Sequence, residues 1–506
     1  MKYVSTRNNR LAVDSAQAIV SGLAPDGGLF LPTEIPSISL DDLTQLAGKP
    51  YAERSAWVLS RFLTDFSYEE LLSYTTKAYC WDKFPVEGTA PLVRIDDSCY
   101  VLELFHGPTC AFKDFALQML PYLLTASLKK TGVDKEVVIL VATSGDTGKA
   151  ALEGFADVEG TRICVFFPDG GTSNMQRLQM VTQDGANVMV AAVKGNFDDA
   201  QNGVKAIFTD KEYAAELAEK GFLLSSANSI NWGRLAPQIA YYVSAYCDMV
   251  NAGAIRMGEA INICVPTGNF GNILAAYYAK HCGVPVNRLI CASNRNSVLT
   301  DFINGGTYDK NRPFYVTSSP SMDILISSNL ERLLYLLCDE DSAKLCGLME
   351  QLKQEGRYSI DPAMLERLQA EFAAGCCSEG ETRRTIRLMA ENKGHCEGRG
   401  YLPDTHTSVG LRVYYDYRFK ECDITPTVVA STASPFKFCN SVLPALGEET
   451  SDDDFAMLER LSELTGLPVP ERLSELRDKA ERFTDVVEKS QMKDVVDSLV
   501  DRRIDR

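Results

Sequence analysis

The sequence predicts an α/β protein with two lobes, each built on a parallel sheet, together with an N-terminal domain and a helical insertion. Two observations support this prediction. Continuous apolar runs, which are typical of strands buried on both faces, alternate with segments of helical spacing. In addition, 506 residues are too many for one compact core, so we expect several domains.

The expected strands are short, apolar and followed by turn or helix signals. They cover residues 99–104 (CYVLEL), 136–143 (EVVILVAT), 162–167 (RICVFF), 186–193 (ANVMVAAV), 261–266 (INICVP) and the run after Pro426. Helical spacing follows most of them, so strand and helix alternate in the manner of a parallel sheet.

The composition of each stretch suggests a domain division. We expect an N-terminal domain at 1–92, a large α/β domain at 93–130 and 225–440, a smaller α/β domain at 131–224, and a C-terminal helical segment at 441–506. Within the large domain, residues 329–400 have long helical patterns and little strand signal, and we expect a helical insertion there.

Charge and cysteine usage exclude several classes of protein. The net charge of -17 repels phosphate backbones and anionic lipid, so we expect neither a nucleic acid nor a membrane partner. The fifteen cysteines form no CxxC pair, and the chain starts without an apolar secretion signal, which favours reduced thiols in the cytoplasm. Cys376, Cys377, His395 and Cys396 lack the paired spacing of zinc sites, so we expect no metal.

Lys113 is the candidate for covalent chemistry. It is expected at or just inside a helix N-terminus, after the loop 106–109 (HGPT), and Phe112 and Phe115 flank it. Apolar surroundings lower the pKa of a lysine and favour the neutral amine that a Schiff base requires. The alternative is a surface lysine whose stem covers apolar neighbours.

Two loops between a strand and a helix are candidates for binding anions. The loop 267–272 (TGNFGN) follows one apolar strand, and the loop 144–148 (SGDTG) follows another. Backbone N–H groups and a helix dipole converge at such a loop, so the first suits a phosphate and the second an amino-acid carboxylate. Either loop could instead be a tight turn or a helix cap.

The two loops and Lys113 together indicate a cofactor and a substrate that both carry negative charge. Pyridoxal phosphate and an amino acid fit this requirement. The first loop lacks the lysine of a Walker loop, which disfavours a nucleotide-binding protein.

Residues 106–115 (HGPTCAFKDF) resemble the lysine motif of the long-form threonine synthases. That family belongs to the tryptophan-synthase-β-like, fold type II group of pyridoxal-phosphate enzymes. Further segments resemble the family in its own order: GLAPDGGLFLP, ATSGDTGKAA, KGNFDDAQ, NSINWGR, TGNFGN, SPSMDILISSNLER and DTHTSVG. The resemblance therefore covers most of the chain.

The resemblance implies that Lys113 forms the Schiff base with pyridoxal 5'-phosphate and that Thr432 hydrogen-bonds the pyridine nitrogen. The residues expected around the cofactor phosphate are Gly268, Asn269, Phe270, Gly271 and Asn272. Those expected at the substrate carboxylate are Ser144, Gly145, Asp146 and Thr147. One departure is Ser434, where some members have histidine in the segment after the threonine.

The implied reaction converts O-phospho-L-homoserine and water to L-threonine and phosphate. The same residues would serve a related phospho-lyase that releases 2-oxobutyrate and phosphate, and a catalytically silent regulator with this fold is a third alternative. Three cations are candidates for binding the substrate phosphate: Lys437, Arg177 and Arg295. We expect His106 and His406 to be structural hydrogen-bonders, and the protein to be a monomer or a homodimer.

Overall fold

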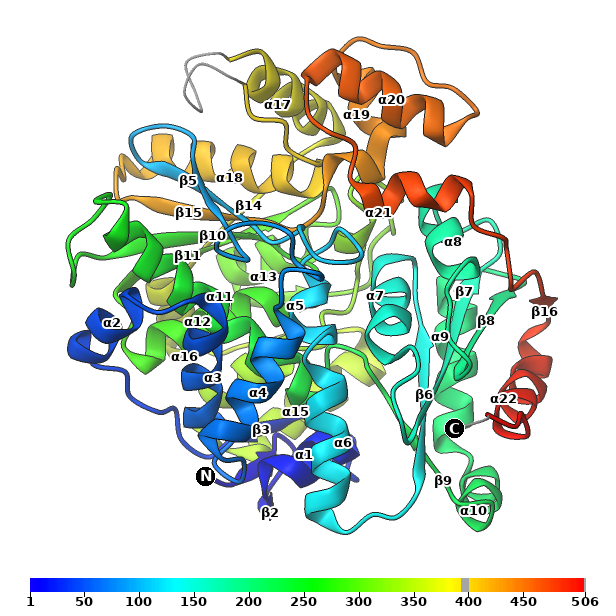
Figure 1. The fold of residues 1–506 in the computed structure, drawn as a ribbon. Coiled ribbons are helices and arrows are strands. Elements are labelled where there is room, and N and C mark those ends of the chain that lie inside the picture. Colours follow the sequence, from blue (N-terminus) through cyan, green and yellow to red (C-terminus); the bar gives the residue numbers. More distant parts are fainter. Residues whose placement is uncertain (393–399, 505–506) are drawn as a thin grey trace.

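The large sheet at the centre of the structure has six strands in the order β14-β11-β10-β15-β5-β4, and every neighbouring pair is parallel except β4 and β5. The computed structural model describes residues 1–392 and 400–504 (Figure 1). The strands of this sheet are β14 Phe372–Cys376, β11 Val286–Ser293, β10 Ile261–Pro266, β15 Thr427–Ser431, β5 Cys99–Glu103 and β4 Leu92–Arg94.

Helices cover both faces of the large sheet because its strands are apolar on both sides. Ile263 and Val265 of β10 pack into the core with α11 and α12, whereas Cys264 points to the opposite face and packs with α18. Figure 1 shows α18 above the sheet and α11 and α12 below it. The helices around this sheet are α5 Lys113–Leu117, α6 Leu120–Thr131, α11 Trp232–Asn251, α12 Gly271–Cys282, α13 Val298–Gly305 and α18 Thr405–Glu421.

The smaller sheet has five parallel strands in the order β16-β8-β7-β6-β9. They are β16 Val486–Val487, β8 Val188–Val193, β7 Thr161–Pro168, β6 Glu136–Ala142 and β9 Phe222–Ser225. Val137 and Ile139 pack against α7, and Val138 and Leu140 pack on the other face against α9 and α22. The helices of this lobe are α7 Asp146–Phe155, α8 Asn174–Val181, α9 Phe197–Thr209, α10 Lys211–Glu219 and α22 Met492–Val500. The predicted architecture of two parallel-sheet lobes is therefore confirmed.

The N-terminal part packs against the central helix α11 and against α6. It contains a small antiparallel sheet in the order β2-β1-β3 and four helices. These elements are β1 Tyr3–Ser5, β2 Asn8–Val13, α1 Ser15–Ser21, β3 Phe30–Pro32, α2 Leu40–Ala47, α3 Tyr51–Phe62 and α4 Tyr68–Ala78.

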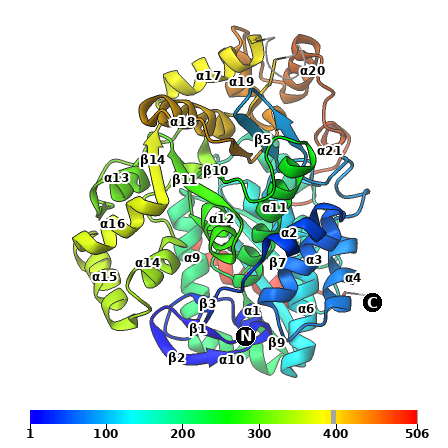
Figure 2. The ribbon, with the colours of Figure 1, turned by 90° about the vertical axis from the view of Figure 1, so that its left-hand side faces the viewer.

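The region between β12 and α18 is helical, as expected, but it also contains strands. Its elements are β12 Thr307–Asp309, η1 Pro320–Met322, α14 Leu330–Leu337, α15 Ser342–Glu355, β13 Arg357–Ser359, α16 Pro362–Glu371, β14 and α17 Glu379–Glu391. Figure 2 shows α13 to α16 gathered on one side of the large sheet. The sequence shows little strand signal in this region, yet β14 extends the large sheet by pairing with β11.

The C-terminal segment is mainly helical, but it returns to the small sheet at its end. The elements before β16 are η3 Pro435–Phe438, α19 Cys439–Ala445, α20 Asp454–Thr465, α21 Glu471–Ser474 and η4 Glu475–Arg477. The short helix η5 Lys489–Gln491 follows β16. β16 then adds an edge strand next to β8, and α22 buries Val496 and Leu499 on that sheet. Among residues 1–392 and 400–504, no helix has both the length and the apolar character of a membrane span.

Candidate active site

Lys113 is the first residue of α5, and the loop before it is fixed by Asp114. The buried carboxylate of Asp114 accepts hydrogen bonds from the backbone N and Oγ1 of Thr109, at 2.9 and 2.7 Å. The loop passes so close that a Cβ atom on Gly107 would lie 2.5 Å from Asp114 Oδ2. Burial raises the pKa of Asp114 to about 6, although its bonds to Thr109 oppose this shift. The helix start that carries Lys113 is therefore held rigidly.

The end of β15 lies beside Lys113. Phe112 donates its backbone N–H to the carbonyl of Thr432 at 2.9 Å, and Ala111 forms an antiparallel bridge with Ala433. Thr432 is buried. The structure therefore brings the expected Thr432 next to Lys113, although the two residues are far apart in the sequence.

The Lys113 amine is nearly enclosed, since its side chain is 12% exposed. Its Nζ lies 3.3 Å from Ser321 Oγ and 3.5 Å from Asp146 Oδ2. Burial lowers the pKa of Lys113, and the cations Arg234 and Lys437 add to this effect, whereas Asp146 opposes it. The environment therefore favours a neutral, nucleophilic amine, as expected from the sequence.

Asp146 is the first residue of α7, and it is enclosed by cations and donors. Its Oδ1 accepts from Lys437 Nζ at 2.7 Å and from Gln176 Nε2 at 2.9 Å, and its Oδ2 accepts from Ser321 Oγ at 3.3 Å. Burial disfavours the charged form, but Lys437 and Lys113 outweigh it and hold the pKa of Asp146 well below its ordinary value. Asp146 is therefore a carboxylate that faces the reactive lysine.

The rest of the α7 loop leaves backbone groups for an anion. The Thr143 hydroxyl accepts the N–H groups of Gly145 and Gly148, each at 3.0 Å, and so fixes the loop. Gly145 has a φ of 143°, and a Cβ atom there would lie 2.5 Å from Gln176 Cδ. The first N–H groups of a helix have no acceptor within the helix, so those at the start of α7 suit a carboxylate. The Asp146 side chain, itself an anion, does not.

The glycine-rich loop connects β10 to α12 and has the features of a phosphate cradle. Phe270 adopts a left-handed φ of 64° directly before α12, which turns successive N–H groups toward one side. A Cβ atom on Gly268 would lie 2.6 Å from the carbonyl oxygen of Ser321. Asn272 accepts hydrogen bonds from Tyr241 and Tyr242, while its buried Nδ2 has no partner among the described residues.

The unsatisfied amide of Asn272 and the start of α12 fit an anionic group such as the phosphate of pyridoxal phosphate. Lys113 supplies the amine that would hold its aldehyde. The residues present therefore match the cofactor that the sequence indicates.

Arg234 is a site residue that sequence reasoning missed. It lies in the first turn of α11, it is 3% exposed, and its Nε has no partner among the described residues. Its Nη1 donates to the carbonyl of Ala227, and no described carboxylate forms an ion pair with it. Burial lowers the pKa of Arg234 to about 10. Nothing in the segment NSINWGR signals this, because an uncompensated buried cation is visible only in the folded structure.

The other candidate cations are placed differently. Lys437 is fully buried and bonded to Asp146, so it belongs to the site. Arg177 forms an ion pair with Glu481 at 2.7 Å, and the exposed Arg295 lies over the ring of Tyr315. Arg177 and Arg295 are therefore engaged with Glu481 and Tyr315, respectively.

Both histidines are hydrogen-bonded side chains. His106 Nε2 lies 2.7 Å from Glu103 Oε2. His406 Nδ1 lies 2.8 Å from Asp404, and its Nε2 accepts the backbone N–H of Ser321 at 3.1 Å. His406 therefore supports the segment whose hydroxyl reaches Lys113. Ser321 is a second residue that the sequence did not reveal.

The expectation about metals concerns a cluster that is only partly described, since His395 and Cys396 lie outside the described residues. Within residues 1–392 and 400–504, no three His, Cys, Asp or Glu side chains gather in a way that could hold a metal ion.

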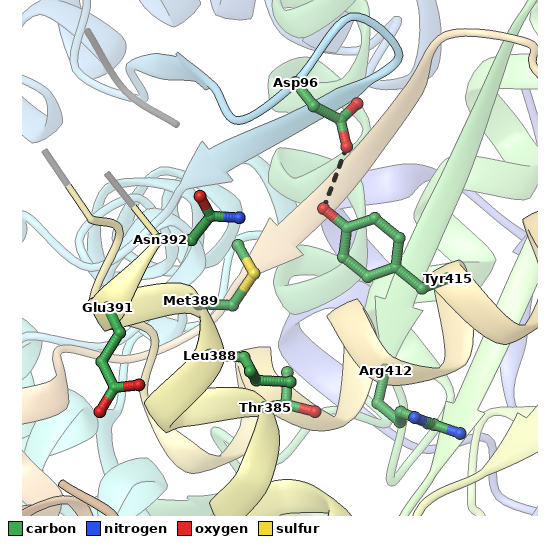
Figure 3. A pocket seen from close by; sticks show the side chains of 8 residues that line it. All are labelled: Asp96, Thr385, Leu388, Met389, Glu391, Asn392, Arg412 and Tyr415. Carbon is green, nitrogen blue, oxygen red and sulfur yellow. Dashed lines mark hydrogen bonds between the residues drawn. The ribbon is translucent and has the colours of Figure 1, made fainter. Parts of the chain in front are cut away.

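A cavity of about 520 Å³ lies apart from Lys113, between α17, α18 and the turn before β5. Figure 3 shows Asp96 reaching Tyr415 across one side of it, with a 3.1 Å hydrogen bond to the tyrosine hydroxyl. Leu388 and Met389 line the apolar side, and Arg412 lies at another edge. None of the site residues described above borders this cavity.

Comparisons with known families agree with the geometry. Three family descriptions match successive parts of the chain: "Threonine synthase N terminus" at residues 2–79, "Pyridoxal-phosphate dependent enzyme" at 84–350 and "Threonine synthase, C-terminal" at 407–496. The middle match contains Lys113 and both loops, and the third contains Thr432 and Lys437.

The chain is also similar to individual proteins of known name or structure. The chain is 40% identical to human "Threonine synthase-like 1" over 90% of its length, but it spans only 61% of that protein. It is 37% identical to "Threonine synthase" of Pseudomonas aeruginosa, covering 92% of this chain and 96% of that protein. A solved structure of PLP-bound threonine synthase from Brucella melitensis is 38% identical, with a TM-score of 0.86 and 99% of each chain covered. The chain therefore belongs to the threonine synthase family of pyridoxal-phosphate-dependent enzymes.

Proposed function

We propose that this enzyme converts O-phospho-L-homoserine and water to L-threonine and phosphate. The observation that carries the proposal is the buried Arg234, which has no ion-pair partner among the described residues, lies outside the glycine-rich loop and has a positive charge that lowers the pKa of Lys113. The start of α12 suits the phosphate of the cofactor, so Arg234 remains for a second phosphate, which the substrate brings. The relatives named threonine synthase support the same reaction.

The residues that would hold the cofactor follow three strands of the large sheet, β5, β10 and β15. Lys113 would attach it covalently, and the loop from Gly268 to Asn272 would bind its phosphate through backbone N–H groups and the amide of Asn272, whose Nδ2 has no partner among the described residues. Thr432 lies at the end of β15 beside Lys113, where its hydroxyl would meet the ring nitrogen.

The substrate's two anionic ends are held by separate groups. The guanidinium of Arg234 would bind the phosphate with its N–H donors, of which Nε has no partner among the described residues. The N–H groups at the start of α7, between Ser144 and Thr147, bind the carboxylate. Since these groups come from α11 and α7, they fix both the orientation of the substrate and its length.

Lys113 also moves protons. An uncombined Lys113 amine would accept the proton from Cα of the substrate, and its lowered pKa suits this role. The bound cofactor supplies an electron sink next to the substrate amine. The substrate must also lose a proton from Cβ as phosphate leaves from Cγ; Cγ then gains a proton, water adds its hydroxyl at Cβ and a proton returns to Cα, so that the sum of substrate and water equals threonine and phosphate. The low exposure of Lys113 limits the entry of further water.

A second candidate reaction is release of 2-oxobutyrate and phosphate from the same substrate. The 40% identity to a protein named threonine synthase-like, rather than threonine synthase, favours keeping this alternative. Lys113, Arg234 and the two loops would serve both reactions, which differ only in the fate of the intermediate after phosphate has left.

Product analysis separates the candidates. The enzyme is incubated with O-phospho-L-homoserine, and phosphate, threonine and 2-oxobutyrate are measured together. Threonine and phosphate in equal amounts support the synthase, and 2-oxobutyrate in place of threonine supports the phospho-lyase. An absence of phosphate release by the cofactor-loaded enzyme would contradict both.

A further inference from the structure

We propose that Lys437 is a positioning residue, whose ammonium draws the Asp146 carboxylate toward itself and so weakens the ion pair between Asp146 and Lys113, in which Oδ2 and Nζ lie 3.5 Å apart. The inference rests on the proposed role of Lys113 as the residue that binds the cofactor. It assigns Lys437 to the neighbouring carboxylate rather than to the substrate phosphate.

The contacts of Lys437 show that its ammonium is already engaged. Its Nζ donates to Asp146 Oδ1 at 2.7 Å and to the carbonyl oxygen of Thr109 at 2.9 Å. Its side chain is fully buried, and that of Asp146 is 3% exposed. Removing one partner of such a buried ion pair destabilises the protein, because the other partner is left as an unpaired charge in the interior.

The pair also joins the two lobes at the reactive amine. Lys437 lies in η3, which follows β15 of the large sheet, whereas Asp146 starts α7, which follows β6 of the small sheet. The carbonyl of Thr109 belongs to the loop that Asp114 fixes before Lys113. Lys437 therefore connects the lysine loop to the other lobe through one ammonium group.

The carboxylate of Asp146 lies closer to the ammonium of Lys437 than to that of Lys113. Asp146 Oδ1 is 2.7 Å from Lys437, whereas Asp146 Oδ2 is 3.5 Å from Lys113. Gln176 donates to the same Oδ1 and Ser321 donates to Oδ2, so the carboxylate is fixed between them. Without Lys437, the only remaining ammonium beside Asp146 among the described residues is that of Lys113.

The charges around Lys113 define the expected electrostatic effect. Asp146 of α7, Lys437 of η3 and Arg234 of α11 act on its ammonium directly. Asp114 lies on its own helix, bonded to Thr109, and His406 of α18 lies behind Ser321. Removing Lys437 takes away one positive charge and leaves Asp146 to stabilise protonated Lys113. The protonated fraction of Lys113 would rise, and a protonated amine cannot attack an aldehyde.

The test measures uptake of the cofactor and needs no substrate. The full chain is stripped of cofactor, pyridoxal 5'-phosphate is added, and growth of the visible absorbance band is followed at several pH values. In this step the neutral Lys113 nitrogen bonds to the aldehyde carbon, and the aldehyde oxygen leaves as water with two protons from the amine. The rate should therefore rise with pH as Lys113 loses its proton, and the midpoint of that rise is the readout.

The expected shifts have opposite signs for the two partners. Lys437→Met should move the midpoint to higher pH, because Asp146 then stabilises the protonated Lys113 amine more strongly. Asp146→Asn should move the midpoint to lower pH, because the positive charges of Lys437 and Arg234 then disfavour protonation of Lys113 without an opposing carboxylate. The double variant should lie closer to the wild type than Lys437→Met does, and Lys437→Arg, which keeps the charge, should remain near the wild type. Lys149→Met is the matched control, since Lys149 is also a buried lysine in an ion pair on α7, with Glu153 at 2.9 Å. Its midpoint should not move.

An unmoved midpoint in Lys437→Met would overturn the inference. If that variant does not fold, Asp146→Asn decides, since a midpoint that fails to fall would overturn the inference equally. Uptake with unmoved midpoints would refute this role of Lys437 and leave the proposed function intact. A wild-type protein that takes up no cofactor at Lys113 would refute both.

Discussion

Replacing Arg234 with methionine should lower activity without lowering stability, which is unusual for a buried residue. Burial reduces the pKa of Arg234 from 12.5 to about 10. At 1.36 kcal/mol per pKa unit, its charge destabilises the unliganded protein by roughly 3 kcal/mol. The variant loses one hydrogen bond to Ala227, worth about 1.5 kcal/mol. The free energy of unfolding should therefore stay the same or rise by up to roughly 2 kcal/mol.

The effect on catalysis has the opposite direction. Arg234 is proposed to give the substrate phosphate two charge-assisted hydrogen bonds, and losing them should cost about 3 kcal/mol. This corresponds to a decrease in kcat/KM of roughly 100-fold. The assays are denaturant unfolding of the cofactor-free protein and steady-state release of phosphate from O-phospho-L-homoserine.

Arg332 provides the matched control. It is also fully buried, with its pKa lowered to about 10, but its guanidinium donates to the carbonyls of Phe30 and Ile230 and to Asn329. Removing the charge has the same effect in Arg332→Met as in Arg234→Met, but Arg332→Met leaves three acceptors unsatisfied instead of one. At about 1–3 kcal/mol for each acceptor, Arg332→Met should be less stable than Arg234→Met by roughly 2–6 kcal/mol. An Arg234→Met variant that is destabilised like Arg332→Met but retains its kcat/KM would refute the reasoning.

Two further predictions concern packing and pH. A Cβ atom on Gly154 would lie 2.1 Å from the carbonyl oxygen of Leu117, so Gly154→Ala should lower the unfolding free energy by about 3 kcal/mol or more. Gly347 lies on the exposed face of α15, and a Cβ atom there would have no neighbouring atom within 4 Å. Gly347→Ala should therefore raise the unfolding free energy by about 1 kcal/mol. Equal denaturation midpoints for the two variants would contradict both predictions. Burial raises the pKa of Asp114 from 3.8 to about 6, so the folded state binds the proton of this carboxyl group more tightly than the unfolded state does. The stability gained from this protonation is complete below pH 3.8 and is lost as the pH rises to about 6. The difference in unfolding free energy between wild type and Asp114→Asn should therefore change by roughly 3 kcal/mol across this pH range, and parallel pH curves would contradict this.

The sequence predicts the fold well where strands are long and apolar. The runs at 136–143 and 261–266 correspond to β6 and β10, because strands buried on both faces require continuous apolar residues. β14 was missed because its sequence, FAAGC, is rich in small residues, and its strand conformation depends on pairing with β11. β16 has two residues, and only its neighbour β8 makes it a strand.

The candidate site divides in the same way. Lys113 and the two loops stand out because a local pattern of strand, small residues and helix start has a direct chemical meaning. Arg234 and Ser321 do not stand out, since their importance depends on burial and on partners distant in the sequence. The contact between Asp146 and Lys437 joins residues 291 positions apart, and no local pattern indicates it.

The role of Lys113 is tested by finding where the cofactor is attached to the protein. The protein is reduced with borohydride in the presence of pyridoxal 5'-phosphate, digested and analysed by mass spectrometry. We predict one reduced cofactor adduct, on the peptide that contains Lys113, and loss of the visible absorbance band in Lys113→Ala. An adduct on another lysine, or an unchanged band in Lys113→Ala, would contradict this prediction.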